Sequence, residues 1–573
     1  MTAINDVTDY TVENRVAVVT IDSPPVNALG HIVRLGISAG LDQALSDQTV
    51  IAVVLRCAGS TFFAGADITE FGKPMASPVL REIAVQIEQA CKPVVAAIHG
   101  TALGGGLETA LACHWRMAAR SARLGLPEVK LGLLAGAGGT QRLPRLVGAA
   151  KALEMVVSGD PIDAQGAFES GLVDLLAESD LRGEAIAFAA SVATRKDALR
   201  RVRDMPPPSF EHGLFAHFRS EKADRLRGFE APEASIQCIE AAVTQSFDEG
   251  MKTERGLFEQ LMTGVQCAAQ RYVFFAERDG GKVPGLPKSV VPRPIAAVAL
   301  FGADCDNEFV KRLRAAGVCL ESADVPENLP TALSTPSTIV FNLVPDVKPH
   351  AAARGAEIFT NCCETSKSAS TVPVRFAPSV EAPQLMEILR TRHVTDEILA
   401  SVLALSKRVG LASVVTSSGG DLIGRRMIAR LEREVERCIA DGVPVTRLLA
   451  VASDFGLTLN TPGIASDRPC DESAGDLLDR LIVPLINEGA TLLEAGVAAR
   501  ASDIDVVCVK QGFFKAYRGG PMFHAGYVGL RHVLLKLREY ELRWGVDYCP
   551  SPLIERLVET GQTLHQFKGL SNG

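Results

Sequence analysis

Short apolar runs alternate with amphipathic stretches through the first 150 residues of the chain. The runs at residues 15–21, 51–55 and 93–98 are bounded by turn residues, which is typical of buried strands in a parallel sheet. Helical spacing of apolar residues fills the intervals, for example at residues 32–45 and 78–90. This alternation predicts an α/β domain in which helices pack on a sheet.

The pattern changes about a third of the way along the chain. Three consecutive prolines, Pro206 to Pro208, interrupt it, and residues 231–278 show helical periodicity with few strand signals. Strand-like runs return at residues 295–301 and 338–343 and predict a second α/β unit. Beyond Gly420 the pattern is almost wholly helical, which predicts an all-α carboxy-terminal region.

These changes divide the chain into four predicted parts. They are an α/β domain at residues 1–204, a helical linker at 205–290, a smaller α/β domain at 291–416 and an all-α region at 417–573. A chain of 573 residues has room for three or four domains of about 150 residues each.

Composition and charge exclude several classes of protein. The net charge is −8 and no block of Lys and Arg stands out, so nucleic acid is not an expected partner. The sequence has no apolar run of about 18 residues and no secretory signal, and it ends without Ser-Lys-Leu, so we expect a cytoplasmic protein with no membrane partner. The 13 cysteines are scattered without zinc-type spacing, which predicts reduced thiols and no metal site.

A glycine-rich turn, Gly104-Gly105-Gly106, is the strongest candidate for chemistry. It opens a predicted helix whose first turn contains Glu108, and Glu128 follows twenty residues later at another turn. Successive glycines allow close approach of a ligand, and the N–H groups of a first helical turn are free to bind an oxyanion. Two carboxylates beside such donors suit acid–base catalysis if their pKa values differ. The same residues could equally form an ordinary tight turn with two solvated charges.

Four segments carry a family resemblance. They are residues 24–29 (PPVNAL), 62–71 (FFAGADITEF), 97–118 (AIHGTALGGGLETALACHWRMA) and 125–152 (GLPEVKLGLLAGAGGTQRLPRLVGAAKA). In this order they resemble the crotonase, or enoyl-CoA hydratase/isomerase, family. The resemblance implies the crotonase spiral fold, with the backbone N–H groups of Ala66 and Gly105 as the oxyanion hole for an acyl-CoA thioester. It also implies that Glu108 and Glu128 are the acid–base pair.

The reaction implied by the resemblance is addition of water to a trans-2-enoyl-CoA. Water attack at C3 places negative charge on the thioester oxygen, where two fixed N–H groups can stabilise it. We expect Glu108 to activate the water and Glu128 to protonate C2. The family also contains Δ3-Δ2-enoyl-CoA isomerases and other acyl-CoA enzymes, and isomerases often keep one of the two carboxylates, so the pair favours a hydratase. We expect a monomer, because additional domains cover the trimerisation surface in the fused members of the family.

The resemblance continues into the second half of the chain. Residues 249–278 resemble the linker helix of bifunctional fatty-acid β-oxidation enzymes, which fuse a hydratase to an L-3-hydroxyacyl-CoA dehydrogenase. Residues 487–507 and 517–522 resemble the helical domains of the same enzymes. This implies a Rossmann-like domain followed by all-α dehydrogenase-type domains, and the short interval between Asp324 and Thr338 predicts that the Rossmann-like domain is truncated.

The NAD-binding motif of that domain is degenerate. The family has G-x-G-x-x-G here, whereas this chain has Gly302 followed by Asp304 and Asn307 at the other two glycine positions. The carboxylate of Asp304 would repel the pyrophosphate. We therefore expect no NAD cofactor.

The dehydrogenase catalytic residues are also altered. The family's catalytic His falls at Val374 and its Asn at Arg425, whereas its Glu is kept as Glu387. We expect a hydratase whose inactive dehydrogenase half serves as a scaffold or retains a reshaped ligand cleft. The alternatives are a bifunctional enzyme with residual NAD-dependent 3-hydroxyacyl-CoA dehydrogenase activity and a non-catalytic acyl-CoA-binding protein.

Overall fold

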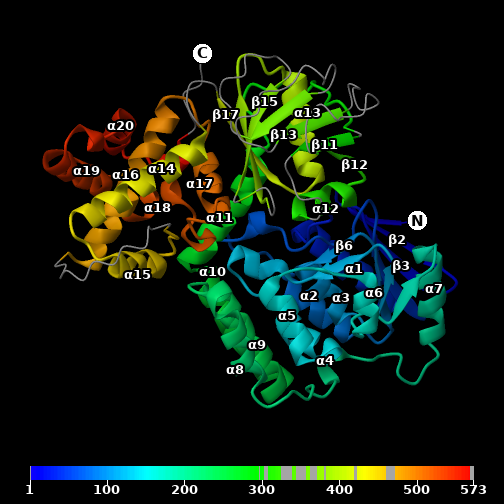
Figure 1. Ribbon diagram of the computed structural model, residues 1–573. Coiled ribbons are helices and arrows are strands. Elements are labelled where there is room, and N and C mark those ends of the chain that lie inside the picture. The colour runs from blue at the N-terminus through cyan, green and yellow to red at the C-terminus, as the bar shows by residue number, and fades with distance from the viewer. Residues whose placement is uncertain are drawn as a thin grey trace. The chain divides into compact units, whose positions relative to one another are not determined.

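A seven-stranded sheet forms the centre of the first half of the chain (Figure 1). In this computed structural model its strands are β1 (Thr2–Asn5), β2 (Thr8–Glu13), β3 (Val16–Ile21), β4 (Ala52–Cys57), β5 (Val94–Ile98), β7 (Trp115–Ala119) and β10 (Leu175–Ala177). They lie in the order β1-β2-β3-β4-β5-β7-β10, with β1 to β3 antiparallel and the others parallel. The strands predicted at residues 15–21, 51–55 and 93–98 are confirmed as β3, β4 and β5.

Helices cover both faces of this sheet. They are α1 (His31–Ser46), α2 (Leu80–Glu88), α3 (Gly105–Ala112), α4 (Gly139–Val147), α5 (Ala149–Ser158), α6 (Ala164–Glu169) and α7 (Leu181–Val192). Alternate residues of β3 divide between the faces, because side chains along a strand point to opposite sides. Val16 and Val18 pack with α7, whereas Ala17 and Val19 join the core that α1 and α2 cover.

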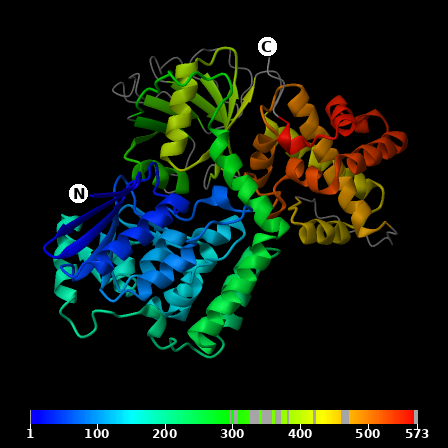
Figure 2. The same cartoon turned by 180° about the vertical axis from the view of Figure 1, so that it is seen from behind.

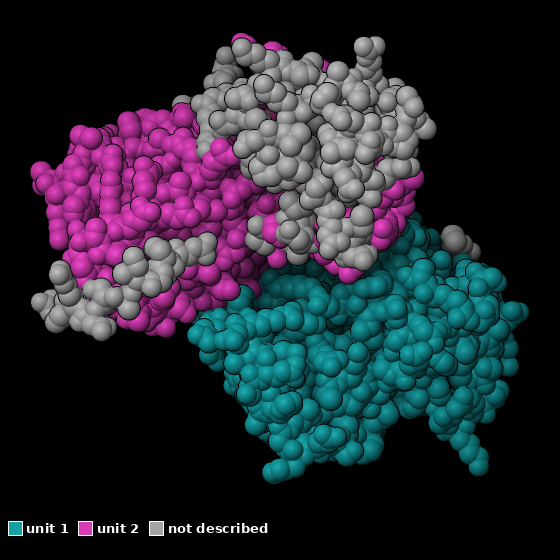
Figure 3. All heavy atoms as spheres, viewed as in Figure 1, with its two compact units in different colours: residues 1–268 teal, residues 269–573 magenta. Residues whose placement is uncertain are grey.

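The structure describes residues 2–295, 297–301, 307–323, 338–342, 357–361, 371–377, 379, 383–417, 422–459 and 472–567. They form two units, Met1–Ala268 (unit 1) and Ala269–Gly573 (unit 2), shown in Figure 3. The division falls inside the predicted linker at 205–290, and the four-part division of the chain stays a prediction.

The helical stretch expected at residues 231–278 consists of three helices. With α8 (Leu214–Leu226) before them, these are α9 (Glu230–Thr244), α10 (Phe247–Met262) and α11 (Val265–Gly280). Ser246 is the N-cap of α10, because its side chain accepts a hydrogen bond from the N–H of Glu249. Helix α10 is therefore separate from α9. Figures 1 and 2 show α9 and α10 beside the helices of unit 1, and Ile236, Ile239 and Val243 of α9 are part of its main core.

Unit 2 contains a second seven-stranded sheet. Its strands are β11 (Ala297–Phe301), β12 (Cys319–Ala323), β13 (Thr338–Asn342), β14 (Glu357–Asn361), β15 (Thr371–Ala377), β16 (Leu385–Arg390) and β17 (Ala412–Ser417). The order is β12-β11-β13-β14-β15-β16-β17, and among the described strands only β15 and β16 pair antiparallel. A doubly wound dinucleotide-binding sheet has two strands outside its first strand, whereas the described part of this sheet has β12 alone beyond β11.

The other described elements of unit 2 are mainly helices. Two accompany the sheet, α12 (Glu308–Ala315) and α13 (Asp396–Arg408). The others are α14 (Ile423–Ala440), α15 (Val445–Phe455), α16 (Ala474–Glu494), α17 (Ala501–Lys510), α18 (Pro521–Val528), α19 (Leu530–Trp544) and α20 (Pro552–Thr560). The predicted α/β class with an all-α carboxy-terminal region is thus confirmed. None of the described helices has the length and hydrophobicity needed to cross a bilayer.

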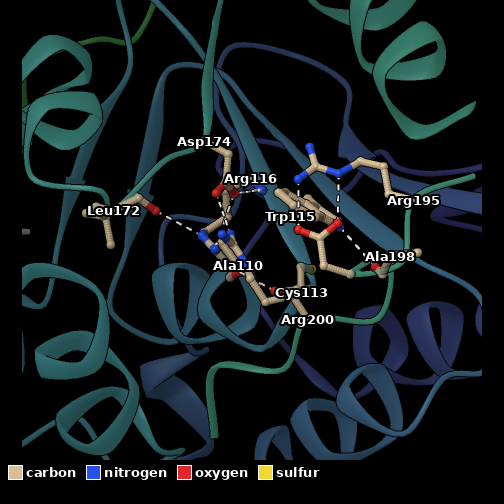
Figure 4. Close-up of polar contacts among 10 residues, drawn as sticks. Ala110, Cys113, Trp115, Arg116, Leu172, Asp174, Arg195, Ala198 and Arg200 are labelled. Carbon is tan, nitrogen blue, oxygen red and sulfur yellow. Dashed lines mark hydrogen bonds and ion pairs between the residues drawn. The ribbon is translucent and has the colours of Figure 1, made fainter. Parts of the chain in front are cut away.

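The buried guanidinium of Arg116 anchors α3, the helix that carries Glu108 (Figure 4). It donates to the carbonyl oxygen of Cys113, at the carboxy-terminal end of α3, at 2.8 Å and to that of Leu172 at 2.9 Å, and it pairs with Asp174 at 3.3 Å. A cation is favoured at the carboxy-terminal end of a helix, where carbonyl groups are left without helical partners. This network therefore fixes α3 from the end opposite its glycine turn.

Candidate active site

The glycine turn brings two backbone donors and one carboxylate together. The short strand β6 (Thr101–Leu103) ends at Gly104, which has a positive φ of 54°, and α3 begins at Gly105. A Cβ at Gly104 would lie 2.9 Å from Oε1 of Glu128, and a Cβ at Gly105 would lie 3.3 Å from the backbone nitrogen of Ala66. The structure thus places the predicted residues Ala66, Gly105 and Glu128 around one turn that only glycine fits.

Glu108 lies in the first turn of α3 and is 3% exposed. Its Oε1 accepts hydrogen bonds from the backbone N–H groups of Ala137 at 2.7 Å and Gly139 at 2.8 Å. Burial raises the pKa of Glu108, while these two bonds and the nearby Arg142 favour the charged form. The Glu108 carboxylate is therefore buried, but two backbone N–H groups donate hydrogen bonds to it.

Glu128 follows β8 (Arg123–Gly125) in the short helical turn Pro127–Leu131. Its Oε2 is buried and has no hydrogen-bond partner among the described residues. Burial raises its pKa well above the ordinary value, and the negative charges of Glu108 and Glu254 raise it further. The two predicted carboxylates therefore lie in one site with different surroundings, since Glu108 has donors and Glu128 has an unpartnered oxygen.

A third buried carboxylate, Glu254 of α10, was not among the predicted site residues. Its two oxygens accept from the N–H groups of Gly138 at 2.7 Å and Thr140 at 3.2 Å, and from the Thr140 hydroxyl at 2.5 Å. The sequence does contain a signal for it. Glu254 falls on the apolar stripe of α10, between Phe247 and Leu261, where a charge is out of place unless it has partners inside the protein.

Arg142 of α4 was also missed. Its guanidinium forms a two-bond pair with Glu88 of α2, at 2.9 and 2.8 Å, and both side chains are buried. Its remaining nitrogen, Nη1, donates to the carbonyl oxygen of Ala137 at 3.0 Å. Arg142 thus supports the residue whose N–H group holds Glu108. The spacing of residues along the sequence does not show this pair, because its members are far apart in the chain.

The altered dehydrogenase positions are partly described by the structure. Val374 is buried in β15 opposite Ile388, and Arg425 lies in the first turn of α14. Glu387 is buried, accepts from the hydroxyl of Thr416 at 3.1 Å and from the N–H of Gly424 at 3.3 Å, and burial raises its pKa to about 6. This carboxylate therefore holds the start of α14.

The predicted NAD motif lies largely outside the described residues, since Gly302 and Asp304 are not among them. Asn307 is described and caps α12, with its side-chain oxygen accepting from the N–H of Val310 at 2.9 Å. Among the described residues, no group of three or more His, Cys, Asp or Glu side chains could hold a metal ion.

Comparison with known proteins shows what the chain is similar to. Residues 11–223 match the family model described as enoyl-CoA hydratase/isomerase. The chain is 28% identical over 696 residues to the peroxisomal bifunctional enzyme of Danio rerio, covering 96% of this chain and 97% of that one. It is 27% identical over 704 residues to the peroxisomal bifunctional enzyme of Homo sapiens, with the same coverage. The glyoxysomal fatty acid beta-oxidation multifunctional protein MFP-a of Cucumis sativus is 26% identical over 698 residues, with 96% of each chain covered.

Residues 11–223, which lie within unit 1, are thus similar to the enoyl-CoA hydratase/isomerase family. Together, the family match and the similarity to bifunctional and multifunctional enzymes over 96% of the chain support a crotonase unit fused to a dehydrogenase-type half. The alignments are longer than this chain of 573 residues, so the relatives contain internal segments that this chain lacks.

Proposed function

We propose that unit 1 is an enoyl-CoA hydratase that adds water across the 2,3 double bond of trans-2-enoyl-CoA thioesters. The observation that carries the proposal is the buried pair of Glu108 and Glu128 beside the glycine turn at which Gly105 lies next to Ala66. Two carboxylates with different surroundings can divide the roles of base and acid. A protein that only binds acyl-CoA has no need for this pair, and the pair favours hydration over isomerisation.

The mechanism assigns one step to each group. The N–H groups of Ala66 and Gly105 bind the thioester oxygen and stabilise the enolate. Glu108, whose charged form is favoured by two N–H donors, takes a proton from water as the oxygen attacks C3. Glu128, whose pKa is raised by burial and by neighbouring negative charges so that its protonated form is favoured, gives its proton to C2. Glu108 then releases its proton to solvent water, and Glu128 takes up a proton from solvent water. Both carboxyl groups are restored, and the net reaction is addition of H and OH across the double bond.

The purified full-length protein is expected to hydrate crotonyl-CoA and a longer trans-2-enoyl-CoA. The measurement is the loss of ultraviolet absorbance of the conjugated thioester, with mass detection of a product 18 Da heavier, the mass of one water molecule. An unconjugated 3-enoyl-CoA serves as the comparison substrate. Conversion of that compound without hydration of either 2-enoyl-CoA would replace this proposal by an isomerase.

We propose further that unit 2 does not use NAD. Val374 cannot take a proton from a hydroxyl group, and Glu387 is held by Thr416 and Gly424. The first turn of α12, where a dinucleotide pyrophosphate would lie, is capped by Asn307. The residues present therefore do not fit the cofactor.

Titration of the full-length protein with NADH is expected to give no saturable fluorescence change up to about 1 mM, a concentration that corresponds to about 4 kcal/mol of binding free energy. A dehydrogenase that carries the complete glycine motif serves as the positive control. Formation of NADH from 3-hydroxybutyryl-CoA and NAD would contradict the proposal.

Acyl-CoA is the partner that this proposal requires. A monomeric state and a cytoplasmic location stay predictions of the sequence. The names of the relatives place them in peroxisomes or glyoxysomes. Size-exclusion chromatography with light scattering and imaging of a tagged full chain would test the two predictions separately.

A further inference from the structure

The turn at residues 137–140 presents four consecutive backbone N–H groups to two different carboxylates. Those of Ala137 and Gly139 donate to Glu108 of α3, at 2.7 and 2.8 Å. Those of Gly138 and Thr140 donate to Glu254 of α10, at 2.7 and 3.2 Å. The two carboxylates therefore hold alternate groups of the same turn from opposite sides.

The shape of the turn makes the two sets of bonds depend on each other. Gly138 has a positive φ of 98° and is the cap residue of α4, which begins at Gly139. The N–H groups of Gly138, Gly139 and Thr140 therefore belong to the free start of a helix, and that of Ala137 directly precedes it. Each peptide held by one carboxylate is adjacent to a peptide held by the other, so loss of the bonds to Glu254 removes restraints from the segment whose N–H groups hold Glu108.

Helix α10 is held at its first residue, Phe247, seven positions before Glu254. The guanidinium groups of Arg142, Arg145 and Arg203 lie 5.2, 5.1 and 4.9 Å from the ring centre of Phe247, the first residue of α10. The Glu254 side chain is fully buried. Thr140 adds a third bond to it through its hydroxyl at 2.5 Å. Burial and three hydrogen bonds therefore restrain the Glu254 carboxylate.

We propose that Glu254 is a positioning residue for the hydration reaction, one that holds the turn at residues 137–140 so that Glu108 is aimed at the attacking water. The proposal rests on the proposed function of unit 1. It makes α10, which lies beyond the 11–223 match to the family and inside the predicted linker, a required part of the active site.

Charged and titratable groups surround Glu254 on several elements. They are Glu108 on α3, Glu128 in the turn after β8, Arg142 on α4 and Cys238 on α9. Burial and the charge of Glu108 raise the pKa of Glu254 to about 8. In turn, the charge of Glu254 helps to raise the pKa of Glu128. A change at Glu254 therefore alters the geometry of one carboxyl group and the titration of the other.

The test is the Glu254→Gln variant of the full-length protein, assayed with crotonyl-CoA. An amide accepts at one end only, so one of the N–H groups of Gly138 and Thr140 loses its acceptor. We expect kcat to fall about 10- to 100-fold, the effect of a small misplacement of a reacting group, with little change in KM. Because a negative charge is removed beside Glu128, the alkaline limb of the kcat/KM profile should move to lower pH.

Three further variants separate positioning from loss of folding. Glu259→Gln removes an exposed carboxylate of the same helix and should leave kcat and the pH profile unchanged. Thr140→Ala removes only the hydroxyl bond to Glu254 and should lower kcat less than Glu254→Gln. Glu254→Asp keeps the charge and should keep the alkaline limb in place. A folded Glu254→Gln protein with the kcat and pH profile of the unaltered protein would overturn the proposal.

Hydrogen exchange distinguishes failure of this proposal from failure of the hydratase assignment. Amides of residues 137–140 should exchange faster in Glu254→Gln than in Glu259→Gln, whatever the reaction of unit 1. If the unaltered protein hydrates no enoyl-CoA, the proposed function fails while this exchange still reports on the turn. Unchanged exchange at the turn would show that Glu254 does not hold it.

Discussion

Replacement of Glu108 by Gln is expected to lower kcat/KM for crotonyl-CoA hydration by about 10³-fold, and replacement of Glu128 by Gln by a similar factor, because each removes one proton-transfer group. Gln keeps the size of the side chain but can neither take a proton from water nor give one to C2. At Glu108, the amide oxygen can still accept from Ala137 and Gly139, so the turn should remain folded. The measurement is steady-state hydration by the full-length variants.

The two variants differ in their expected pH dependence. Glu108 must be ionised, so activity of the unaltered protein is lost as the pH falls through its raised pKa. Glu128 must be protonated, so activity is lost as the pH rises through its own raised pKa. The residual activity of Glu108→Gln should therefore lack the acid limb, and that of Glu128→Gln the alkaline limb. Glu154→Gln, at an exposed site on α5, is the control. Full hydration by either active-site variant would contradict the assigned roles.

The sequence predicted the layers of the fold because their signals are local. The strand β5 is five consecutive buried apolar residues, and the helix α1 shows helical spacing throughout. The boundaries between successive helices were harder to predict from the sequence. The break between α9 and α10 depends on the cap that Ser246 supplies to Glu249, and the periodicity of residues 231–278 runs through it.

The candidate site was predictable where its residues lie beside glycine turns or within the family resemblance. Gly105, Glu108 and Glu128 are of this kind. The hydrogen bonds that hold Glu108 were not predictable, because they depend on residues that are distant in the chain. Glu254 lies 146 positions after Glu108, and only the three-dimensional packing of α10 on α4 brings it to the same turn.

The buried pair of Glu88 and Arg142 gives the largest expected effect on stability. Arg142→Met leaves Glu88 as a carboxylate that is 1% exposed and has lost its guanidinium partner. Loss of one partner of a buried ion pair costs about 3 to 5 kcal/mol. We expect the unfolding transition of unit 1 to move down by roughly 10 °C in calorimetry of the full-length protein. Lys151→Met, which breaks an exposed pair with Glu154, should change it little.

The double variant Glu88→Leu/Arg142→Met separates the two roles of Arg142. Since Glu88 is no longer present as a buried carboxylate without its guanidinium partner, the double variant should be more stable than Arg142→Met alone. Its hydratase activity should nevertheless stay low, because the bond from Arg142 to the carbonyl oxygen of Ala137 is still missing and Ala137 holds Glu108. Recovery of activity together with stability would mean that Arg142 acts on the site only through folding. If the double variant regains stability but not activity, Arg142 is, like Glu254, a residue that positions Glu108.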